Sequence, residues 1–181
     1  MSEFRVDSGQ IREILSRLRV GDRVWLTGTV FTARDAAHQR IERLLDTGGQ
    51  LPFALQNAII YYAGPTPTPE NLPIGSCGPT TSGRMDWIAP RFYDLGVAAT
   101  VGKGGRSGAV TDSIKRNGAV YLCAVGGAGA LYARCVKKCE VIAFEDLGCE
   151  SVKRLEVEDF PLVVGIDSEG GTLFSTFNLQ L

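Results

Sequence analysis

Short apolar runs alternate with helix-forming runs in the second half of this chain, and glycines separate them. Residues 97–101 (VAATV) are mostly apolar, residues 107–118 (SGAVTDSIKRNG) have apolar side chains at helical spacing, and residues 119–124 are again apolar. A short apolar run bounded by turn residues is typical of a buried strand. Strands that alternate with short helices usually form a sheet covered by those helices. The sequence therefore predicts an α/β fold with a covered mixed sheet.

The rest of the chain continues this pattern. Gly48 with Gly49, and Gly118, are expected to end helices, and Pro90 is expected to interrupt or bound another. Further strands are expected over residues 21–33, within 55–69, near 136–144 and over 161–167, and further helices over residues 11–20, 34–49, 84–96 and within 119–136. With no internal repeat, low-complexity segment or clear linker, the chain is expected to form a single domain over residues 1–181.

The composition narrows the class of protein. Of 181 residues, 44% are hydrophobic and 22% are charged, which is the usual mix for a globular domain with a sizeable core. The net charge of −1 gives no basic field, so neither nucleic acid nor a membrane surface is an expected partner. No apolar run is long enough to span a bilayer, and residues 1–10 lack an apolar signal segment. The predicted location is the cytoplasm.

Cysteine and histidine usage argues against a metal site in this chain. Five cysteines are an odd number, and only Cys135 and Cys139 lie close together in the sequence. Their spacing alone matches neither a zinc ribbon nor an iron–sulfur motif, so they are expected to be structural. The single histidine, His38, leaves little for a histidine-based metal site or a serine–histidine relay. Demanding chemistry would have to use other residues or a cofactor held by a partner.

Polar residues gather where predicted strands give way to turns. Arg34, Arg84 and Lys103 each lie in such a place, and ligands of open α/β sheets collect at the carboxyl ends of strands. We therefore expect the three cations to converge. The stretches that carry them are TARDAAH at residues 32–38, GPTTSGRMD at residues 78–86 and VGKGG at residues 101–105.

Two of these stretches have simpler interpretations as well. Arg34 with Asp35 also has a simpler interpretation as a solvated pair at a helix start, where a carboxylate is favoured. Residues 101–105 suggest a phosphate-binding glycine turn but lack the spacing of a P-loop and of a dinucleotide fingerprint. The glycine-rich residues 125–130 (VGGAGA) suggest a dinucleotide turn too, but no well-placed acidic residue follows, so close helix–sheet packing is the better interpretation.

Residues 78–86 are harder to explain as a simple turn. A β-turn requires neither three consecutive hydroxyl residues nor the Gly-Arg pair that follows them. Hydroxyls and backbone amides, with a guanidinium group behind them, can form a receptor for a carboxylate or a phosphate. Three cations together with hydroxyls suit a small dicarboxylate.

The order of these stretches carries a resemblance to a known family. FTARDAAH, GPTTSGRMD and GKGG, followed by GAVYLCAVGGAGAL and EVEDFPLVV, resemble the β subunit (or C-terminal domain) of class I iron–sulfur fumarate hydratases and L(+)-tartrate dehydratases. The resemblance extends from about Arg19 to Phe174, and GPTTSGRMD is specific to that family. It implies a swivelling β/β/α domain. It also implies a separate α subunit in an α2β2 heterotetramer, and the three cysteines of that subunit hold a 4Fe-4S cluster with one open iron position.

The resemblance also implies roles for individual residues. Arg34, Arg84 and Lys103 match the cations that hold the dicarboxylate, while the open iron acts as a Lewis acid on the substrate. Thr80 matches the hydroxyl residue that moves the proton next to the carboxylate, and Thr81 is expected to bind a carboxylate oxygen or the turn backbone. A threonine hydroxyl is a weak acid, so cations or the partner chain would have to activate it. Gly105 departs from the pattern, because a polar residue commonly follows GKG.

The predicted activity is the reversible hydration of fumarate to L-malate, a step of the tricarboxylic acid cycle. The chain is expected to be inactive without its α subunit. Two alternatives stay open: the β subunit of an L(+)-tartrate dehydratase, and a binding module for a small anion or nucleotide that has no catalytic activity.

Overall fold

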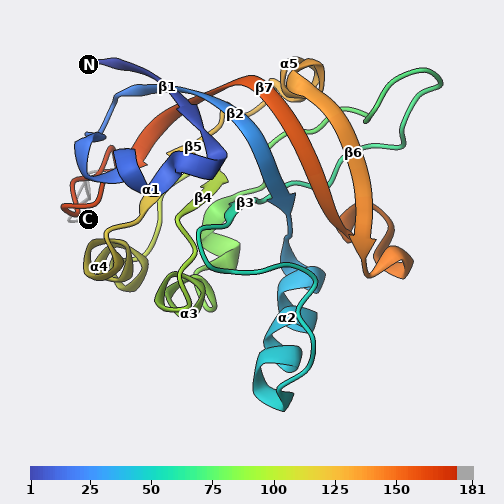
Figure 1. Ribbon diagram of the computed structural model, residues 1–181, viewed down its shortest axis with the longest axis horizontal. Coiled ribbons are helices and arrows are strands. Elements are labelled where there is room, and N and C mark those ends of the chain that lie inside the picture. The colour runs from blue at the N-terminus through green and yellow to red at the C-terminus, as the bar shows by residue number, and fades with distance from the viewer. Residues whose placement is uncertain (175–181) are drawn as a thin grey trace, which may run out of the picture.

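The computed structural model describes residues 1–174, which form a seven-stranded mixed sheet with short helices around it (Figure 1). The strands are β1 (Glu3–Asp7), β2 (Arg23–Thr32), β3 (Ile59–Tyr61), β4 (Ala99–Gly102), β5 (Val120–Cys123), β6 (Val136–Ala143) and β7 (Val152–Ile166). The α-helices are α1 (Ile11–Ile14), α2 (Asp35–Thr47), α3 (Ala89–Asp94), α4 (Gly108–Asn117) and α5 (Gly129–Cys135). Shorter 3₁₀ turns cover Ser8–Gln10, Leu15–Arg17, Ser82–Met85 and Glu145–Glu150.

The sheet closes on itself. Its order is β1-β2-β3-β4-β5-β7-β6, with β1 to β5 in parallel and β7 antiparallel to its neighbours. An additional antiparallel pairing joins β7 to β2 and makes the arrangement barrel-like. The predicted α/β class and mixed sheet are confirmed. The swivelling behaviour and the single domain over 1–181 stay predictions, and residues 175–181 lie outside the described residues.

Alternating side chains of the strands divide the core in two. In β3, Ile59 and Tyr61 belong to one hydrophobic cluster, while Ile60 belongs to the other, as the two-residue period of a strand requires. The first cluster includes Tyr132 from α5, and the second takes its helical residues from α2, α3 and α4. Figure 1 shows α3 and α4 on one side of the sheet and α5 on the other. Helices therefore cover both faces of the sheet.

Glycines end the two longest helices where the sequence predicted. Gly48 follows α2 with φ of 66°, and Gly118 follows α4 with φ of 56°. Both lie in the left-handed region, where a residue without a Cβ atom is not strained. Pro90 lies in the first turn of α3, so it bounds that helix rather than interrupting it. Among residues 1–174, no helix has the length and apolarity that crossing a bilayer requires.

The predicted helix over residues 11–20 is wrong in its extent. One α-helical turn, α1, is followed by a 3₁₀ turn over Leu15–Arg17, in which the Leu18 amide donates to the Leu15 carbonyl. Ile11, Leu15 and Leu18 are all buried, at spacings of four and then three residues. The tighter turn keeps Leu18 on the buried side, because a 3₁₀-helix has three residues per turn.

Two stretches of strand were missed. β1 has one buried side chain, Val6, and it pairs only with β2, so no apolar run marks it. β7 begins at Val152 rather than at the predicted residue 161, and residues 153–159 are mostly charged. This part of β7 lies between β2 and β6 and pairs with both. Backbone pairing along two long neighbours thus specifies the strand where hydrophobicity does not.

Candidate active site

Two strands end where the predicted site residues begin. Arg34 lies two residues beyond β2, immediately before α2, and Lys103 follows β4 directly. Residues 78–86 cross the same edge of the sheet and pair with the chain just past β3 and, through Thr81, with Lys103. The carboxyl ends of neighbouring parallel strands thus bring three polar segments together.

Backbone hydrogen bonds fix residues 78–86 against the strands. The Thr80 amide donates to the Tyr62 carbonyl at 2.7 Å, and the Lys103 amide donates to the Thr80 carbonyl at 3.2 Å. The Ser82 amide donates to the Lys103 carbonyl at 2.8 Å. A Cβ atom on Gly102 would lie 2.0 Å from the Ser82 hydroxyl oxygen, so only glycine permits this close approach. Thr80 and Lys103 are therefore backbone neighbours.

The two adjacent threonines face different surroundings. Thr80 is buried, with 9% of its surface exposed, whereas Thr81 is exposed. Within residues 1–174 the Thr80 hydroxyl makes no hydrogen bond, and it is not among the fully buried polar atoms that lack a partner. A hydroxyl in a recess that remains accessible can bind or exchange a proton with a small ligand.

Arg34 and Arg84 meet on one carboxylate. The Asp35 carboxylate lies 3.1 Å from Nε of Arg34 and 2.8 Å from Nη2 of Arg84. Nε of Arg34 also lies 3.4 Å from Glu150, whose other oxygen accepts from the Ala36 amide at 2.8 Å. Arg34 and Asp35 are thus a pair at a helix start, as the simpler interpretation has it, but the pair extends to Arg84. The convergence of these two arginines is present in the structure.

Lys103 remains available for a ligand. Its side chain is exposed and runs along the glycine turn after β5, with its amino nitrogen 3.7 Å from where a side chain on Gly126 would begin. In the part of the chain that the structure describes, it forms no ion pair with a carboxylate, unlike Arg34 and Arg84. The five predicted site residues therefore lie at one edge of the sheet.

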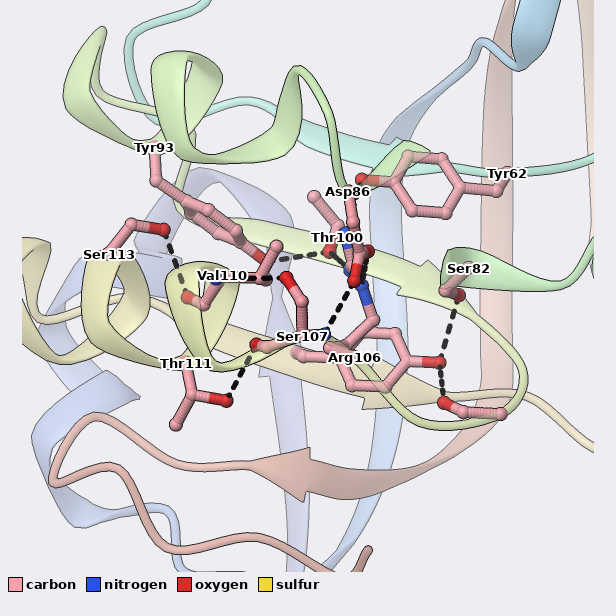
Figure 2. A network of polar contacts seen from close by, with 12 residues as sticks. Tyr62, Ser82, Asp86, Tyr93, Thr100, Arg106, Ser107, Val110, Thr111 and Ser113 are labelled. Carbon is pink, nitrogen blue, oxygen red and sulfur yellow. Dashed lines mark hydrogen bonds and ion pairs between the residues drawn. The ribbon is translucent and has the colours of Figure 1, made fainter. Parts of the chain in front are cut away.

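A buried ion pair beneath this edge was not predicted. Nε of Arg106 lies 2.6 Å from Asp86, and the Arg106 side chain has no exposed surface (Figure 2). The other Asp86 oxygen accepts from the Ser107 amide at 2.5 Å, and Nη1 of Arg106 donates to the Thr100 hydroxyl at 3.0 Å. Asp86 ends the quoted motif, but no sequence pattern distinguishes a buried arginine from a solvated one.

Aromatic rings and hydroxyls enclose this pair. The Arg106 guanidinium carbon lies 5.4 Å from the Tyr62 ring centre and 4.9 Å from that of Tyr121, within the range of a cation–π contact. The Tyr121 hydroxyl lies 2.9 Å from the Ser82 hydroxyl and donates to the Gly104 carbonyl at 2.9 Å. Burial disfavours the charge, yet Tyr62, Tyr93 and Asp86 raise the pKa of Arg106 above its ordinary value. Arg106 therefore remains charged.

His38 lies behind the site, one helical turn after Arg34. Its ring is fully buried, stacks on Phe92 at 5.1 Å and meets the Tyr62 ring edge-on at 5.4 Å. Neither ring nitrogen has a hydrogen-bond partner among the described residues. Burial lowers the pKa of His38 to about 4, so the ring is neutral at physiological pH.

The five cysteines, all within the described residues 1–174, belong to no group of three or more potential metal ligands. Iron–sulfur clusters are bound by cysteine thiolates, and burial raises the pKa of the Cys77 thiol to about 12 and that of Cys123 to about 11. Across residues 1–174, no three cysteine, histidine, aspartate or glutamate side chains gather closely enough to hold a metal ion. The residues present therefore do not fit a 4Fe-4S cluster.

An apolar groove lies elsewhere on the molecule. It has a volume of about 310 Å³ and lies between α5 and the adjoining parts of β2 and β7. None of the five predicted site residues lines it. The predicted site is instead an open surface, with Thr81, Arg84 and Lys103 exposed.

Comparisons with known proteins agree with the motifs of the sequence. A family model described as "Fumarase C-terminus" matches residues 1–177. Fumarate hydratase 2 of Leishmania major is 44% identical over 168 residues, which cover 92% of this chain and 30% of that protein. The anaerobic class I fumarate hydratase of Escherichia coli is 40% identical over 173 residues, covering 91% and 31%. This chain therefore spans about a third of the length of these enzymes.

A relative of similar length has a different name. The putative L(+)-tartrate dehydratase subunit beta of Methanocaldococcus jannaschii is 41% identical over 173 residues. The match covers 92% of this chain and 89% of that protein. The same kind of chain thus occurs among known proteins both as part of a longer enzyme and as a subunit.

Proposed function

The chain belongs to the fumarase C-terminus family, and from this premise we propose that it contributes the dicarboxylate-binding part of a hydro-lyase active site. The proposed reaction is the reversible hydration of fumarate to L-malate. The single observation that carries the proposal is the gathering of three cations and the Thr80 hydroxyl at the ends of β2 and β4. The proposed place in the tricarboxylic acid cycle rests on this activity, and a cytoplasmic location is proposed separately.

A dicarboxylate needs two sites of positive charge, and the geometry supplies them. Arg84 has an exposed side chain and one carboxylate partner, Asp35, so a substrate carboxylate could take up its remaining donors. Arg34, held by two carboxylates, is the more rigid of the two arginines. Lys103 would bind the second carboxylate as a mobile point charge. Thr81, exposed beside Lys103, would donate a hydrogen bond to a carboxylate oxygen.

Thr80 is proposed to move the proton at the carbon next to the carboxylate. Its hydroxyl lies in a recess, and its backbone is bonded to that of Lys103. A threonine hydroxyl is too weak an acid to serve unaided, so a cation beside it must stabilise the alkoxide form. The proposal therefore assigns proton transfer to Thr80 and carboxylate binding to its cationic neighbours.

The site is proposed to be completed by a second chain. Solvent-exposed cations bind carboxylates weakly, because water and salt screen their charge. Hydration or dehydration of a dicarboxylate requires an active site from which bulk water is excluded. The proposed partner is an α subunit that holds the 4Fe-4S cluster, in an α2β2 assembly. Two observations support a partner: the cysteines here do not fit a cluster, and the relative from Methanocaldococcus jannaschii is named a subunit beta.

The experiment is an anaerobic assay of the chain with and without its partner. The pair should interconvert fumarate and L-malate, and the chain alone should be inactive and free of stoichiometric iron. Preference for L(+)-tartrate would identify a tartrate dehydratase instead, an alternative that the name of the relative from Methanocaldococcus jannaschii supports. Binding of dicarboxylates by the chain without turnover in any assembly would support the non-catalytic module.

A further inference from the structure

The buried Arg106–Asp86 pair joins the far ends of the two segments that carry the predicted site residues. Thr80 and Asp86 bound one segment, and Lys103 and Arg106 bound the other. The near ends are joined by the backbone hydrogen bond from the Lys103 amide to the Thr80 carbonyl at 3.2 Å. The far ends are joined by the ion pair of 2.6 Å. The two segments thus form a closed loop with a contact at each end.

The second segment needs such an anchor because glycines separate its ends. Gly104, with φ of 80°, and Gly105 lie between Lys103 and Arg106. Glycine has the largest conformational freedom of any residue, so this turn gains little order from its own sequence. The Arg106 side chain, bonded to Thr100 and enclosed by aromatic rings, fixes the far end of the turn (Figure 2).

Arg106 is too deeply buried to bind substrate itself. Its side chain has no exposed surface, whereas Asp86 is 15% exposed. Its guanidinium group already has partners in Asp86 and Thr100, and its faces lie against Tyr62 and Tyr121. Its effect on a ligand must therefore pass through the residues that it holds.

We propose that Arg106 and Asp86 are positioning residues that set the place of Lys103 relative to Thr80 in the active site. This inference rests on the proposed function for its catalytic consequence. The positioning itself concerns only the described residues. A displacement of about 1 Å in a catalytic group can lower a rate by about 100-fold, so loss of the pair should reduce kcat strongly. KM should change less than kcat, because Arg34 and Arg84 still bind one of the two carboxylates.

The test replaces both charges at once. Removing one partner leaves an uncompensated buried charge, whereas replacing both by apolar residues of similar size is often tolerated. The double variant Asp86→Leu with Arg106→Met should therefore fold, with kcat reduced by about 100-fold in the assembled enzyme. Arg106→Lys keeps the charge but cannot bond Asp86 and Thr100 together, so its kcat should lie between those of the double variant and the native enzyme.

Hydrogen exchange provides a readout that does not depend on activity. In the double variant, the amides of Ser82 and Lys103 should exchange at least about tenfold faster, because their bonds join the two segments. The Val164 amide, bonded to the Asp22 carbonyl at 2.9 Å, joins neither segment and is the internal control.

The two measurements separate two kinds of failure. Unchanged exchange at Ser82 and Lys103, or unchanged kcat in an active assembly, would overturn the positioning role. A native assembly that is inactive on every dicarboxylate would refute the proposed function, and the exchange data would still decide whether the pair positions the segments. If the double variant does not fold, Arg106→Lys carries both measurements, with the same amides and the same expected directions.

Discussion

The chain buries two cations next to the predicted site and holds them by different chemistry. Arg106 lies between tyrosine rings and is paired with the Asp86 carboxylate. Lys153, on β7, is 8% exposed, and its amino group donates to the carbonyls of Gly148, Cys149 and Ser151 and to the Ser151 hydroxyl. The charge of Arg106 is neutralised by an ion pair with Asp86. The charge of Lys153 is solvated by neutral carbonyl and hydroxyl dipoles.

The pKa values of the two side chains move in opposite directions. Burial disfavours both charges, but Tyr62, Tyr93 and Asp86 more than offset it and raise the pKa of Arg106. Within residues 1–174, no carboxylate forms an ion pair with Lys153, and burial lowers the pKa of this lysine. The difference suggests different uses. Arg106 fixes the geometry between Thr80 and Lys103 at any ordinary pH. Lys153 instead holds the turn over residues 148–151, and the stability of that turn depends on the protonation of the lysine.

The largest expected effect is that of an unpaired buried charge. Asp86→Leu, with Arg106 retained, should lower the free energy of unfolding by about 3–5 kcal/mol, measured by chemical denaturation. Glu158→Leu is the matched control: it breaks an exposed pair with Lys137 and should cost at most about 1 kcal/mol. Equal costs for the two variants would mean that the Arg106 charge is solvated, contrary to the comparison.

His38 extends the comparison to a buried base whose ring nitrogens have no hydrogen-bond partner within residues 1–174. Its pKa of about 4 in the folded chain lies below its ordinary value of 6.5, so between these values the unfolded chain binds a proton that the folded chain does not. Stability should therefore fall as pH decreases from 6.5 to about 4, by about 3 kcal/mol in total. His38→Phe, which suits the contact with Phe92, should remove that part of the pH dependence in denaturation at several pH values.

The His38 variant has a built-in control. At pH 8 the histidine is neutral in both states, so His38→Phe should change stability little there, apart from packing. A native protein whose stability between pH 6.5 and 4 matches that of the variant would show that the ring nitrogens find partners in solution.

Among the exposed cations, Lys103 should matter most for activity. Lys103→Ala in the assembled enzyme should lower kcat/KM by about 100-fold, or about 2.7 kcal/mol of transition-state stabilisation. Its matched control is Lys138→Ala, an exposed lysine on β6. Near-native kinetics for Lys103→Ala would return this residue to the interpretation of a solvated turn.

The alternation of apolar runs with helix-forming runs predicted the fold class. Parallel strands covered by helices on both faces must be apolar, and glycines mark the ends of the helices in the sequence. Gly48 and Gly118 fulfil that prediction in the left-handed region. Strand β1 and the charged start of β7 were missed because their pairing partners, rather than their own composition, specify them.

The site was only partly predictable for the same reason. Arg34, Arg84 and Lys103 follow strand ends, a place that the sequence reveals. Of the two carboxylates that contact these arginines, Asp35 adjoins Arg34 in the sequence, but Glu150 comes from a distant part of the chain. The burial of Arg106 depends on rings from β5 and the end of β3, and no local pattern encodes it.

The smallest expected effect is that of Lys153, and it separates a solvated charge from a paired one. Lys153→Met removes the cation together with its cost of burial and leaves no charge behind, only carbonyls that lack a donor. The free energy of unfolding should fall by about 1–2 kcal/mol, less than for Asp86→Leu. Since the turn over 148–151 carries Glu150, which binds the Ala36 amide and Arg34, KM for the substrate should also rise, by about threefold at most.

The pH dependence gives the sharper measurement for Lys153. Because its pKa is lower in the folded chain than its ordinary value of 10.5, the unfolded chain binds the extra proton as pH approaches 10.5. Native stability should therefore rise with pH in the range just below 10.5, and Lys153→Met should lack this rise, whereas Lys138→Met should keep it. A Lys153→Met cost equal to that of Asp86→Leu, with no change in pH dependence, would mean that backbone carbonyls hold a charge as firmly as a carboxylate does. Arg106 and Lys153 would then stabilise the segments around the site to the same degree.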